Sequence, residues 1–499
     1  MTQLDDLQAY TNLEMPRRVV LLTPAIVGYD GDPNDGGAPA ILQNAPAGTY
    51  YRQETPLEVY WQRTTVSTWL VSSSSVGQSV TEEDFTVTIS ATGEDPTGPL
   101  LIRNQAESTA WGDFATIPAA IATLPEILNH IVTVVLPDGV YELDGKSFGN
   151  LSRFEVGYKS DFDTGAIRFR GLNWIRAAST STYTVLSSDQ SVGSVTLTAD
   201  PGFSVDQYRS YYMRIVSGPN AGAYRPIRTH NGVTFYIAGD VAPITNSVVE
   251  IVTPATQVKL YAQLHYMEVP LSSIYRTVEF ARIEFIPPDA VTWGNLILDT
   301  HGHIMISEGC RFNQVILIAS SMGKISQRTC VFLLTTYVPS YDFGAIVATD
   351  GGFRTDWGSS RPLCIIALCR YGIFVQSSGS YASQGASAFT FKAQSVDGVS
   401  IAAIGLEGPY STVYISGGTA GADNWWRIGS TVPYAIHCKN GSKFSLSKYS
   451  DFNQASLSTF RGATNDLLID GVGIDWSDIY ADSDKCVLGS CGAKVIQQV

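Results

Sequence analysis

The chain has 499 residues, of which 44% are hydrophobic and 16% are charged, and its formal net charge is −14. An ordinary globular domain carries roughly 25% charged residues, so glycine, serine and threonine must supply much of the polar surface. This balance argues against a basic footprint for nucleic acid or for an anionic membrane surface. Disorder is excluded because the hydrophobic content suffices for a large core. At roughly 150 residues per domain, the length allows three or so domains or one long repetitive body.

Neither export nor membrane insertion is expected. Residues 1–18 lack the apolar core of a secretory signal, and apolar runs such as residues 131–136 fall far short of the ~18 residues that span a bilayer. Synthesis in a cytoplasm is therefore expected. An odd number of cysteines without a Cys-x-x-Cys pair favours buried free thiols over zinc or a complete disulfide framework. They are Cys310, Cys330, Cys364, Cys369, Cys438, Cys486 and Cys491.

An aromatic β-hairpin is predicted within residues 44–70. The surrounding residues 18–95 are strand-like, and alternating positions on either side of Pro56 favour two paired strands. The aromatic rings either form the core of a small β-module or make a face that packs against a partner protein. The rings that the hairpin would display are Tyr50, Tyr60, Trp61 and Trp69.

Residues 114–143 contain the clearest local signal in the chain. Apolar residues recur at helical spacing from Ile117 to Leu124, and Pro118 falls in the first helical turn, where proline is tolerated. Residues 127–136 then predict a near-continuous buried strand, followed by a turn at 137–139. A helix that leads into a buried strand is typical of a cap over the open end of a stacked parallel sheet.

Weak repeats follow further along the chain. GHIMISEGCRF (302–312) and MGKISQRTCVF (322–332) share a similar start and a Cys-x-Phe end, and looser copies begin at 351, 379 and 441. Short apolar runs at 296–300 and 315–320 lie between them. Strands at intervals of roughly 20–30 residues, separated by polar turns, predict a β-solenoid whose coils must stack to bury their inner faces. A large β-sandwich is the alternative.

Residues 181–254 interrupt this pattern. Alternating strands are joined there by turns at Gly218-Pro219-Asn220 and at Asn231-Gly232. Asn-Gly between alternating strands is a strong hairpin signal, so this stretch predicts a small antiparallel β-domain inserted in the first coils.

Four stretches resemble parts of bacteriophage virion proteins. GTYYRQET (48–55), followed by VYWQR, looks like the hairpin modules of tail fibre, tailspike and baseplate proteins. The block from 204 to 252 is similar to an insert of phage virion proteins, with Gly218, Ala221, Gly222, Asn231 and Thr234 as its hallmarks. The cap at 114–143 resembles that of pectin-lyase-like right-handed β-helices in phage tail proteins, and DWSDIYADSD (475–484) resembles their closing segment.

The resemblance implies an all-β chain with a right-handed parallel β-helix body, a small N-terminal β-module and an inserted antiparallel β-domain. It further implies a homotrimer of tailspike or baseplate type in the virion tail, which contacts other tail proteins and adheres to the host surface, where surface glycan is a candidate partner. The expected segments are 1–95 for virion attachment, 96–180 for the cap and first coils, 181–254 for the insert, 255–473 for the main body and 474–499 for a C-terminal cap.

Two other functions compete with the structural role. A tailspike depolymerase would need two carboxylates about 5–10 Å apart on one face, and aromatic rings such as Trp357, Tyr371 and Tyr381 would stack on sugar. A head-decoration protein would share the fold and differ in where it docks. We favour the interpretation that each candidate acid is a solvent-exposed residue in a turn. The candidates are Glu279, Glu284, Asp299, Glu308, Asp342, Asp350, Asp356 and Glu407.

Asp299-Thr-His301-Gly-His303 is the one pattern with metal-ligand spacing. In a strand, His301 and His303 face the same side, an arrangement that can hold a metal with Asp299 nearby, although His-x-His also occurs by chance in β-rich chains. No phosphate-binding loop, nucleophile elbow or catalytic Cys-His pair is present in the sequence. We therefore assign no catalytic, cofactor or metal residue and expect no cofactor, no nucleic-acid partner and no enzymatic activity.

Overall fold

A computed structural model of the chain divides into two compact units, residues 1–134 with 148–162 (unit 1) and residues 135–147 with 163–499 (unit 2). No helix among the residues that the structure describes is long and apolar enough to cross a membrane. The described residues are 21–22, 27–45, 50–53, 59–65, 68–71, 85–89, 110–122, 124, 127–128, 130–142, 148, 151–156, 166–177, 182–189, 193–238, 244–270, 277–299, 301–336, 344–355, 362–383, 389–393, 400–408, 410–416, 426–428, 434–439, 443–447, 460–461, 466–470 and 488–490.

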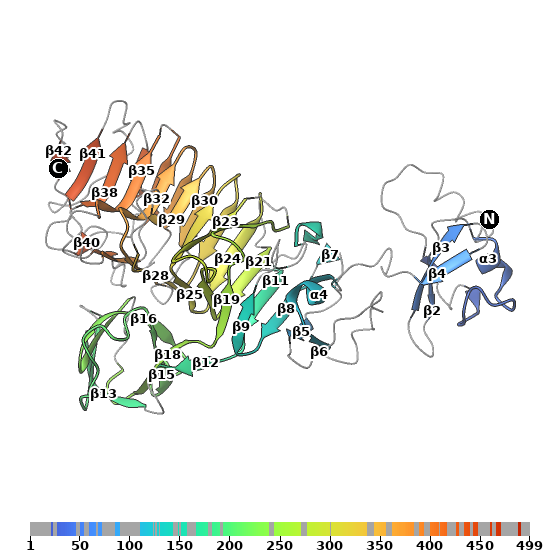
Figure 1. Ribbon diagram of the computed structural model, residues 1–499, viewed down its shortest axis with the longest axis horizontal. Coiled ribbons are helices and arrows are strands. Elements are labelled where there is room, and N and C mark those ends of the chain that lie inside the picture. The colour runs from blue at the N-terminus through green and yellow to red at the C-terminus, as the bar shows by residue number, and fades with distance from the viewer. Residues whose placement is uncertain are drawn as a thin grey trace. The chain divides into compact units, whose positions relative to one another are not determined.

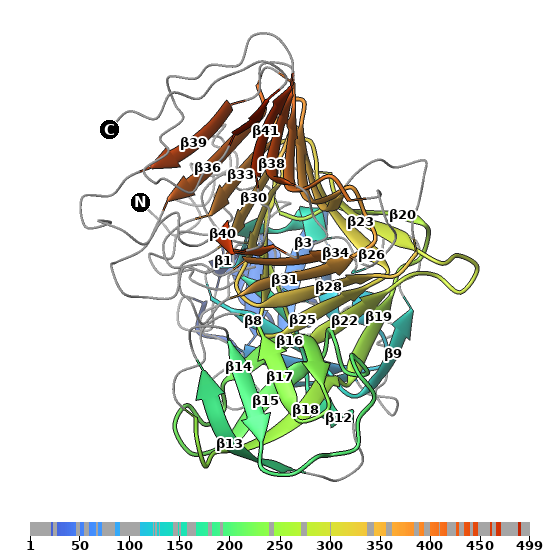
Figure 2. The same cartoon turned by 90° about the vertical axis from the view of Figure 1, so that its left-hand side faces the viewer.

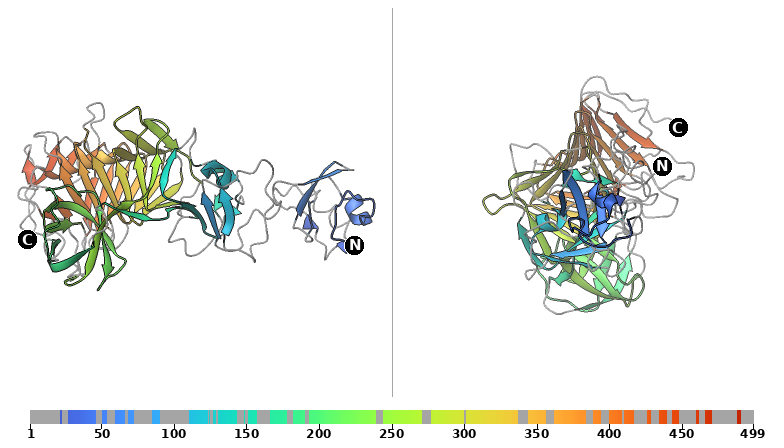
Figure 3. Two further views of the ribbon diagram at one scale, coloured as in Figure 1. Left: turned by 60° about the horizontal axis from the view of Figure 1, so that its bottom comes forward. Right: turned by 90° about the vertical axis from the view of Figure 1, so that its right-hand side faces the viewer.

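Unit 1 contains a four-stranded sheet beside a short helix (Figure 3). Tyr51 and Trp69 are buried in its core with their ring centroids 6.3 Å apart, and Trp69 Nε1 donates a hydrogen bond to the carbonyl of Leu42. Trp69 therefore belongs to the core of a small β-module and is not part of a face displayed to a partner protein. The side chains of Tyr50 and Tyr60 lie outside the part of the chain that the structure describes. The elements are β1 (Leu21–Leu22), α3 (Ala40–Gln43), β2 (Tyr50–Gln53), β3 (Val59–Thr65) and β4 (Thr68–Val71).

The predicted helix and strand of residues 114–143 are both present. Ile117, Ala120 and Ile121 are buried on one face of helix α4, as the helical spacing predicts. The strand is divided in two, and β8 alternates between buried and half-buried positions instead of being buried throughout. The elements are β5 (Phe85–Ile89), β6 (Ala110–Phe114), α4 (Ile117–Ala122), β7 (Ile127–Leu128), β8 (Val132–Leu136), the 3-10 turn η2 (Leu151–Arg153) and β10 (Glu155–Val156).

Unit 2 is a parallel β-helix with three sheets, which Figure 1 shows side-on and Figure 2 nearly end-on. The first sheet contains β11 (Ile167–Gly171), β21 (Val278–Ala281), β24 (His303–Ser307), β27 (Lys324–Gln327), β30 (Gly352–Thr355), β33 (Ser380–Ser383), β36 (Thr412–Ser416) and β39 (Lys443–Ser447).

The second sheet contains β9 (Gly139–Glu142), β19 (Thr256–Lys259), β22 (Ile283–Ile286), β25 (Cys310–Asn313), β28 (Cys330–Leu334), β31 (Leu363–Ala367), β34 (Phe389–Ala393), β37 (Trp426–Ile428) and β40 (Phe460–Arg461). The third contains β20 (Leu264–Met267), β23 (Gly294–Leu298), β26 (Val315–Ala319), β29 (Gly344–Thr349), β32 (Tyr371–Gln376), β35 (Ala402–Glu407), β38 (Tyr434–Lys439), β41 (Asp466–Asp470) and β42 (Leu488–Ser490).

The chain visits the three sheets in a fixed order. From β21 to β41 each coil contributes one strand to the first, second and third sheet in turn, and each strand pairs in parallel with the strand three places later. Seven such coils follow one another. Parallel pairing between successive coils is the arrangement of a solenoid and excludes the antiparallel sandwich that was the alternative. The predicted parallel β-helix is confirmed.

The sequence repeats lie in register on neighbouring coils. Cys310 pairs with Cys330 and Phe312 with Phe332, and these two phenyl rings stack with their centroids 4.5 Å apart and their planes 5° from parallel. Such ladders arise because equivalent inward positions of adjacent coils share one core. In the C-terminal segment 474–499 the structure describes β42, which pairs with β41, and the rest of the expected cap lies outside the described residues.

An antiparallel domain, here called the insert, leaves the solenoid between β11 of the first sheet and β19 of the second. Six of its seven described strands, β13 to β18, close into a ring through an extra pairing of β15 with β18, and β12 pairs with β18 beside it. The ring encloses a core of its own. The predicted hairpin at Asn231-Gly232 is present, and Gly232 has the positive φ of +70° that such a turn requires. The strands are β12 (Trp174–Arg176), β13 (Tyr183–Asp189), β14 (Ser194–Leu197), β15 (Tyr212–Ser217), β16 (Tyr224–Asn231), β17 (Thr234–Ile237) and β18 (Val248–Pro254).

The insert packs on the outer face of the second sheet (Figure 2). The Tyr212 hydroxyl donates a 2.6 Å hydrogen bond to the carbonyl of Cys310, and Arg311 Nη2 donates to Ser210 Oγ at 3.0 Å. A shared apolar cluster and a buried polar bridge therefore fix the insert to the solenoid. The cluster joins Tyr212, Ala238 and Val252 of the insert to Val331, Cys364 and Ile366 of the second sheet.

The four described cysteine side chains are buried, as expected for thiols used as small apolar groups. Burial raises the pKa of Cys310 to about 12 and that of Cys330 well above its usual value. Because the thiolate is the reactive form, we expect iodoacetamide at pH 8 to leave both residues unmodified in the native protein and to alkylate both in urea. Peptide mass mapping of the two samples checks this, and equally fast native alkylation would contradict it.

Candidate functional site

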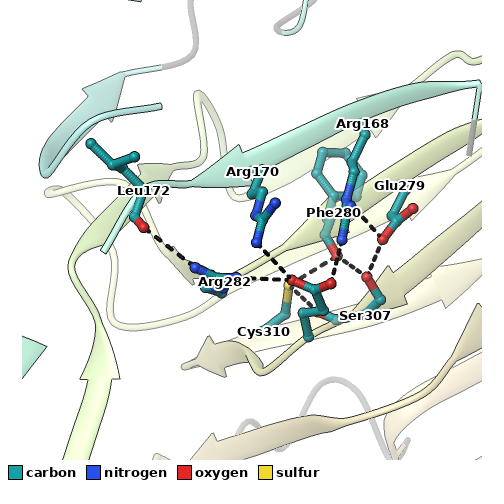
Figure 4. A network of polar contacts seen from close by, with 9 residues as sticks. Arg168, Arg170, Leu172, Glu279, Phe280, Arg282, Ser307 and Cys310 are labelled. Carbon is teal, nitrogen blue, oxygen red and sulfur yellow. Dashed lines mark hydrogen bonds and ion pairs between the residues drawn. The ribbon is translucent and has the colours of Figure 1, made fainter. Parts of the chain in front are cut away.

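Two arginines point outward from β11 of the first sheet. In β11 the buried residues Ile167 and Phe169 alternate with Arg168 and Arg170, so the strand period of two places both guanidinium groups on the outer face. Figure 4 shows them beside side chains from the next two coils. β11 thus supplies the cationic half of a polar cluster.

Glu308 is the centre of this cluster. It lies in the turn between β24 and β25, where its Oε1 accepts a 2.5 Å hydrogen bond from Arg168 Nη2. Its Oε2 is 3.3 Å from Arg282 Nη2 and 3.7 Å from Arg170 Nη2. Three guanidinium groups therefore surround one carboxylate, which is 34% exposed. Charge-assisted contacts of this kind tie the coils of β11, β21 and β24 to one another.

A second carboxylate, that of Glu279 on β21, lies on the far side of Arg168. Its side chain is 1% exposed, its Oε1 is 3.2 Å from Arg168 Nε, and it accepts a hydrogen bond from the hydroxyl of Ser307. Arg168 therefore lies between the two carboxylates and contacts both of them. Together with Arg170 and Arg282, the five charged groups carry an excess of one positive charge.

This carboxylate pair does not fit acid-catalysed cleavage of a glycosidic bond. That reaction needs one carboxyl group that stays protonated near neutral pH, with the sugar between the two acids. Partial burial favours the neutral form of Glu308, but Arg168, Arg170 and Arg282 hold its pKa below the usual value. A guanidinium group also occupies the space between Glu279 and Glu308. The arrangement fits ion pairing and anion recognition instead.

The lowered pKa of Glu308 predicts a pH effect on stability. A depressed carboxyl pKa contributes stability above the unfolded value of about 4.3, and this contribution is lost as pH falls through the folded pKa. We expect Glu308→Gln to lower the free energy of unfolding by about 1–2 kcal/mol at pH 7, intermediate between an exposed and a buried pair, and by progressively less as the pH falls through the folded pKa. Melting temperatures from pH 7 to 3 measure the convergence. Glu142→Gln, whose side chain is 73% exposed, is the control. Parallel curves for Glu308→Gln and the native protein would contradict the prediction.

The insert meets the solenoid at the residue after Glu308. Gly309 has a φ of +81°, and a Cβ atom built on it would lie 2.4 Å from Trp174 Cη2 and 3.1 Å from Tyr224 Cε2. The Trp174 ring in turn contacts Tyr212, with centroids 5.3 Å apart, and Tyr224 at 5.1 Å. The rings of Trp174 and Tyr224 approach the backbone at position 309 so closely that this position, beside the charged cluster, must be glycine.

Other candidate acids form structural contacts at separate places. Asp299 and Asp350 are exposed in turns between the third and first sheets, where they accept hydrogen bonds from Ser320 at 3.0 Å and from Ser378 at 2.7 Å. Glu407 ends β35, and Glu284 is buried in an ion pair with Arg311. The candidates Asp342 and Asp356 lie outside the described residues.

The proposed sugar-stacking rings are wrong where the structure describes them. Tyr371 is 2% exposed, and its hydroxyl lies 3.0 Å from His437 Nδ1. Tyr381 is 1% exposed and stacks on Phe353. Neither ring can reach a saccharide, and Trp357 lies outside the described residues. Both rings lie on buried parts of their strands, because β32 is buried from Tyr371 to Val375 and Tyr381 pairs in register with the buried Phe353.

The histidine pattern does not gather a ligand set among the described residues. His301 is exposed, while His303 is half-buried with its Nε2 2.8 Å from Ser326 Oγ. No group of three or more His, Cys, Asp or Glu side chains in the described part of the chain is placed to hold a metal ion.

Sequence reasoning named Glu279 and Glu308 but missed the arginines around them. The alternation in Ile-Arg-Phe-Arg (167–170) is the signal that was available, because it places two guanidinium groups on the outer face of a buried strand. Arg282 carries no such signal, since it is a lone turn residue in the sequence.

No protein-family model and no curated protein matches the chain. Three solved structures are similar to it. The Gp54 tailspike of Acinetobacter baumannii bacteriophage AP22, in complex with A. baumannii capsular saccharide, has 8% identity over 68% of this chain and 70% of that one, with a TM-score of 0.18. The tailspike protein gp49 from Pseudomonas phage LKA1 has 8% identity, 72% and 68% coverage and a TM-score of 0.16. The Pseudomonas phage phi297 tailspike gp61 has 11% identity, 72% and 73% coverage and a TM-score of 0.19. Likeness at these TM-scores carries no argument about fold or function.

Proposed function

We propose that the chain is a structural protein of a bacteriophage tail, of tailspike or baseplate type, that adheres to the host surface. The observation that carries the proposal is the uninterrupted stack of seven coils, to which the insert is fixed by an apolar cluster and hydrogen bonds. Backbone pairing along the whole stack makes a stiff body suited to a mechanical role. The order of the phage-like stretches, namely module, cap, insert and coils, supports the phage assignment.

The proposal includes a homotrimer attached to the particle through residues 1–95. Its adhesive surface lies on the solenoid and the insert. Closed symmetry is the common form of soluble homo-oligomers, and a subunit of this kind joins its neighbours through extended faces.

Particle labelling and host-cell binding test the proposal. An antibody against the insert, imaged by electron microscopy on purified phage particles, should place gold on the tail, and gold on the capsid would favour a head-decoration protein instead. The purified protein should also bind cells of the phage's host and lose binding to mutants without surface polysaccharide. Absence of label from the particle would overturn the virion role.

The same preparation separates adhesion from depolymerisation. Incubation with purified host polysaccharide should release no new reducing ends if the protein is an adhesin. If the Glu279→Gln and Glu308→Gln variants still release reducing ends, the polysaccharide is cleaved at another site. Release that is lost in either variant would contradict the acid–base argument given for this pair.

A further inference from the structure

Two β-bulges of the insert each present an aliphatic side chain to solvent. The register of β13 on β14 shifts at Leu186, and that of β15 on β18 shifts at Val216. These two side chains are 57% and 40% exposed. The half-buried Val248 begins β18, the strand that pairs with both β13 and β15. Because a β-bulge turns a side chain in a direction that regular pairing would not give, these three residues place an aliphatic patch on three neighbouring strands.

Two arginines lie on the same outer face of the insert. Val249 of the core separates Val248 from Glu250, so the strand period places the latter two on the outside of β18. The Glu250 carboxylate accepts hydrogen bonds of 2.7 Å from Arg176 Nε and 3.1 Å from Arg214 Nη1. Glu250 is 5% exposed, whereas the two arginine side chains are 46% and 40% exposed. One positive charge is therefore in excess, and the remaining N–H donors of both guanidinium groups are available to a further acceptor.

We propose that this face of the insert docks an extended peptide segment of a partner protein. An acidic side chain of the segment binds Arg176 and Arg214, and its aliphatic side chains pack on the patch. A carboxylate is the planar acceptor that guanidinium groups bind through two parallel hydrogen bonds. An extended chain repeats its side chains on one face about every 6.6 Å, which is also the step between alternate residues of a strand such as β15. The segment should therefore carry an aliphatic residue two positions after the acidic one.

The charge of this face selects a peptide over other occupants. Anionic membranes are bound by clusters of about 4–8 lysines and arginines, and two arginines that share one carboxylate supply less charge than that. A second copy of the chain, related by a two-fold axis, would bring the same positively charged face against itself. An acidic segment of a different protein meets neither difficulty. This docking role goes beyond the host adhesion proposed above and does not depend on it.

Saturation-transfer NMR of the full-length protein with synthetic peptides tests the inference. The probe is acetyl-TETLTL-amide, and its matched controls are acetyl-TQTLTL-amide, which lacks the carboxylate, and acetyl-TETSTS-amide, which lacks the aliphatic side chains. We expect the probe to bind with an affinity that weakens as salt rises, and each control peptide to bind more weakly. Arg176→Gln and Arg214→Gln should each lower the affinity for the probe about five- to tenfold, because each removes a charge-assisted contact. Leu186→Ser should weaken binding as well.

Each arginine variant leaves the other arginine paired with Glu250, and its melting temperature checks that it has folded. Lys324→Gln and Met322→Ser are the matched control variants. Both side chains are exposed on the solenoid, outside the insert, so their replacement should change the affinity less than about twofold.

Several results would overturn the inference. They are no binding of the probe, equal binding of acetyl-TQTLTL-amide, or native affinity in both arginine variants. Binding to phosphatidylglycerol vesicles that is lost in Arg214→Gln would identify a membrane as the occupant instead. Self-association in sedimentation velocity that is lost in the same variant would identify a second copy. None of these results decides the labelling and cell-binding tests, so failure of the docking site is distinguishable from failure of the tail role.

Discussion

Replacement of Arg311 by methionine is expected to lower the free energy of unfolding by about 3–5 kcal/mol. The Arg311 and Glu284 side chains are 8% and 3% exposed and are joined by a 2.6 Å contact between Nη1 and Oε1. The guanidinium group also lies 4.9 Å from the Tyr211 ring of the insert. Without the guanidinium group, the carboxylate of Glu284 stays buried. Its remaining hydrogen-bond partner among the described residues is the side-chain amide of Gln257, whose nitrogen lies 2.8 Å from Glu284 Oε2. An uncompensated buried charge is the origin of the cost.

Chemical denaturation of the variant measures this loss. Arg214→Met is the control, because Arg214 is 40% exposed and its ion pair with Glu250 should contribute about 1 kcal/mol or less. Adding Glu284→Leu to Arg311→Met removes the stranded charge and should restore most of the stability, since apolar groups often replace a buried pair without loss. An Arg311→Met variant as stable as the Arg214→Met control would show that the bridge contributes little.

Substitution of Gly309 by alanine is expected to cost about 2–5 kcal/mol and to displace the insert from the second sheet. Two effects add at this position. A left-handed residue with a side chain costs about 1–2 kcal/mol, and forcing an extra carbon into a packed site costs about 1–3 kcal/mol. The φ of Gly309 is +81°, and the new Cβ would meet Trp174 at 2.4 Å. The turn between β24 and β25 and the base of the insert cannot both keep their positions.

Gly222→Ala isolates the packing contribution. Gly222 has a similar φ of +89°, and a Cβ there would meet nothing within 4 Å. Its substitution should therefore cost the backbone part alone, about 1–2 kcal/mol. Thermal unfolding compares the two variants, and limited proteolysis reports whether the insert has loosened. Equal losses in the two variants would show that the contact between Trp174 and the turn does not hold the insert.

The body of the fold could be predicted because its signals are local or repeat along the chain. The Cys-x-Phe repeats at 302–312 and 322–332 predicted adjacent coils, and Phe312 and Phe332 do stack in register. The hairpin at Asn231-Gly232 and the helix that begins at Ile117 were likewise present in short windows of residues. The aromatic rings were less predictable, because alternation alone does not tell which face of a strand is covered. Trp69, for which a core and a surface position were both considered, and Tyr381, which the depolymerase alternative would place at a surface, are both buried.

The sequence by itself determined an all-β solenoid with an interrupted coil, since periodicity, turn residues and stacking are properties of neighbouring residues. The charged cluster was decided only by tertiary structure. Arg168 and Glu308 are 140 residues apart, and they meet because the insert loops out between β11 and β19 and the next two coils bring Glu279 and Glu308 beside β11. The same stacking places Glu284 and Arg311 on adjacent strands beneath the insert. Register between distant coils depends on the length and path of everything between them, so no local pattern could specify these pairs.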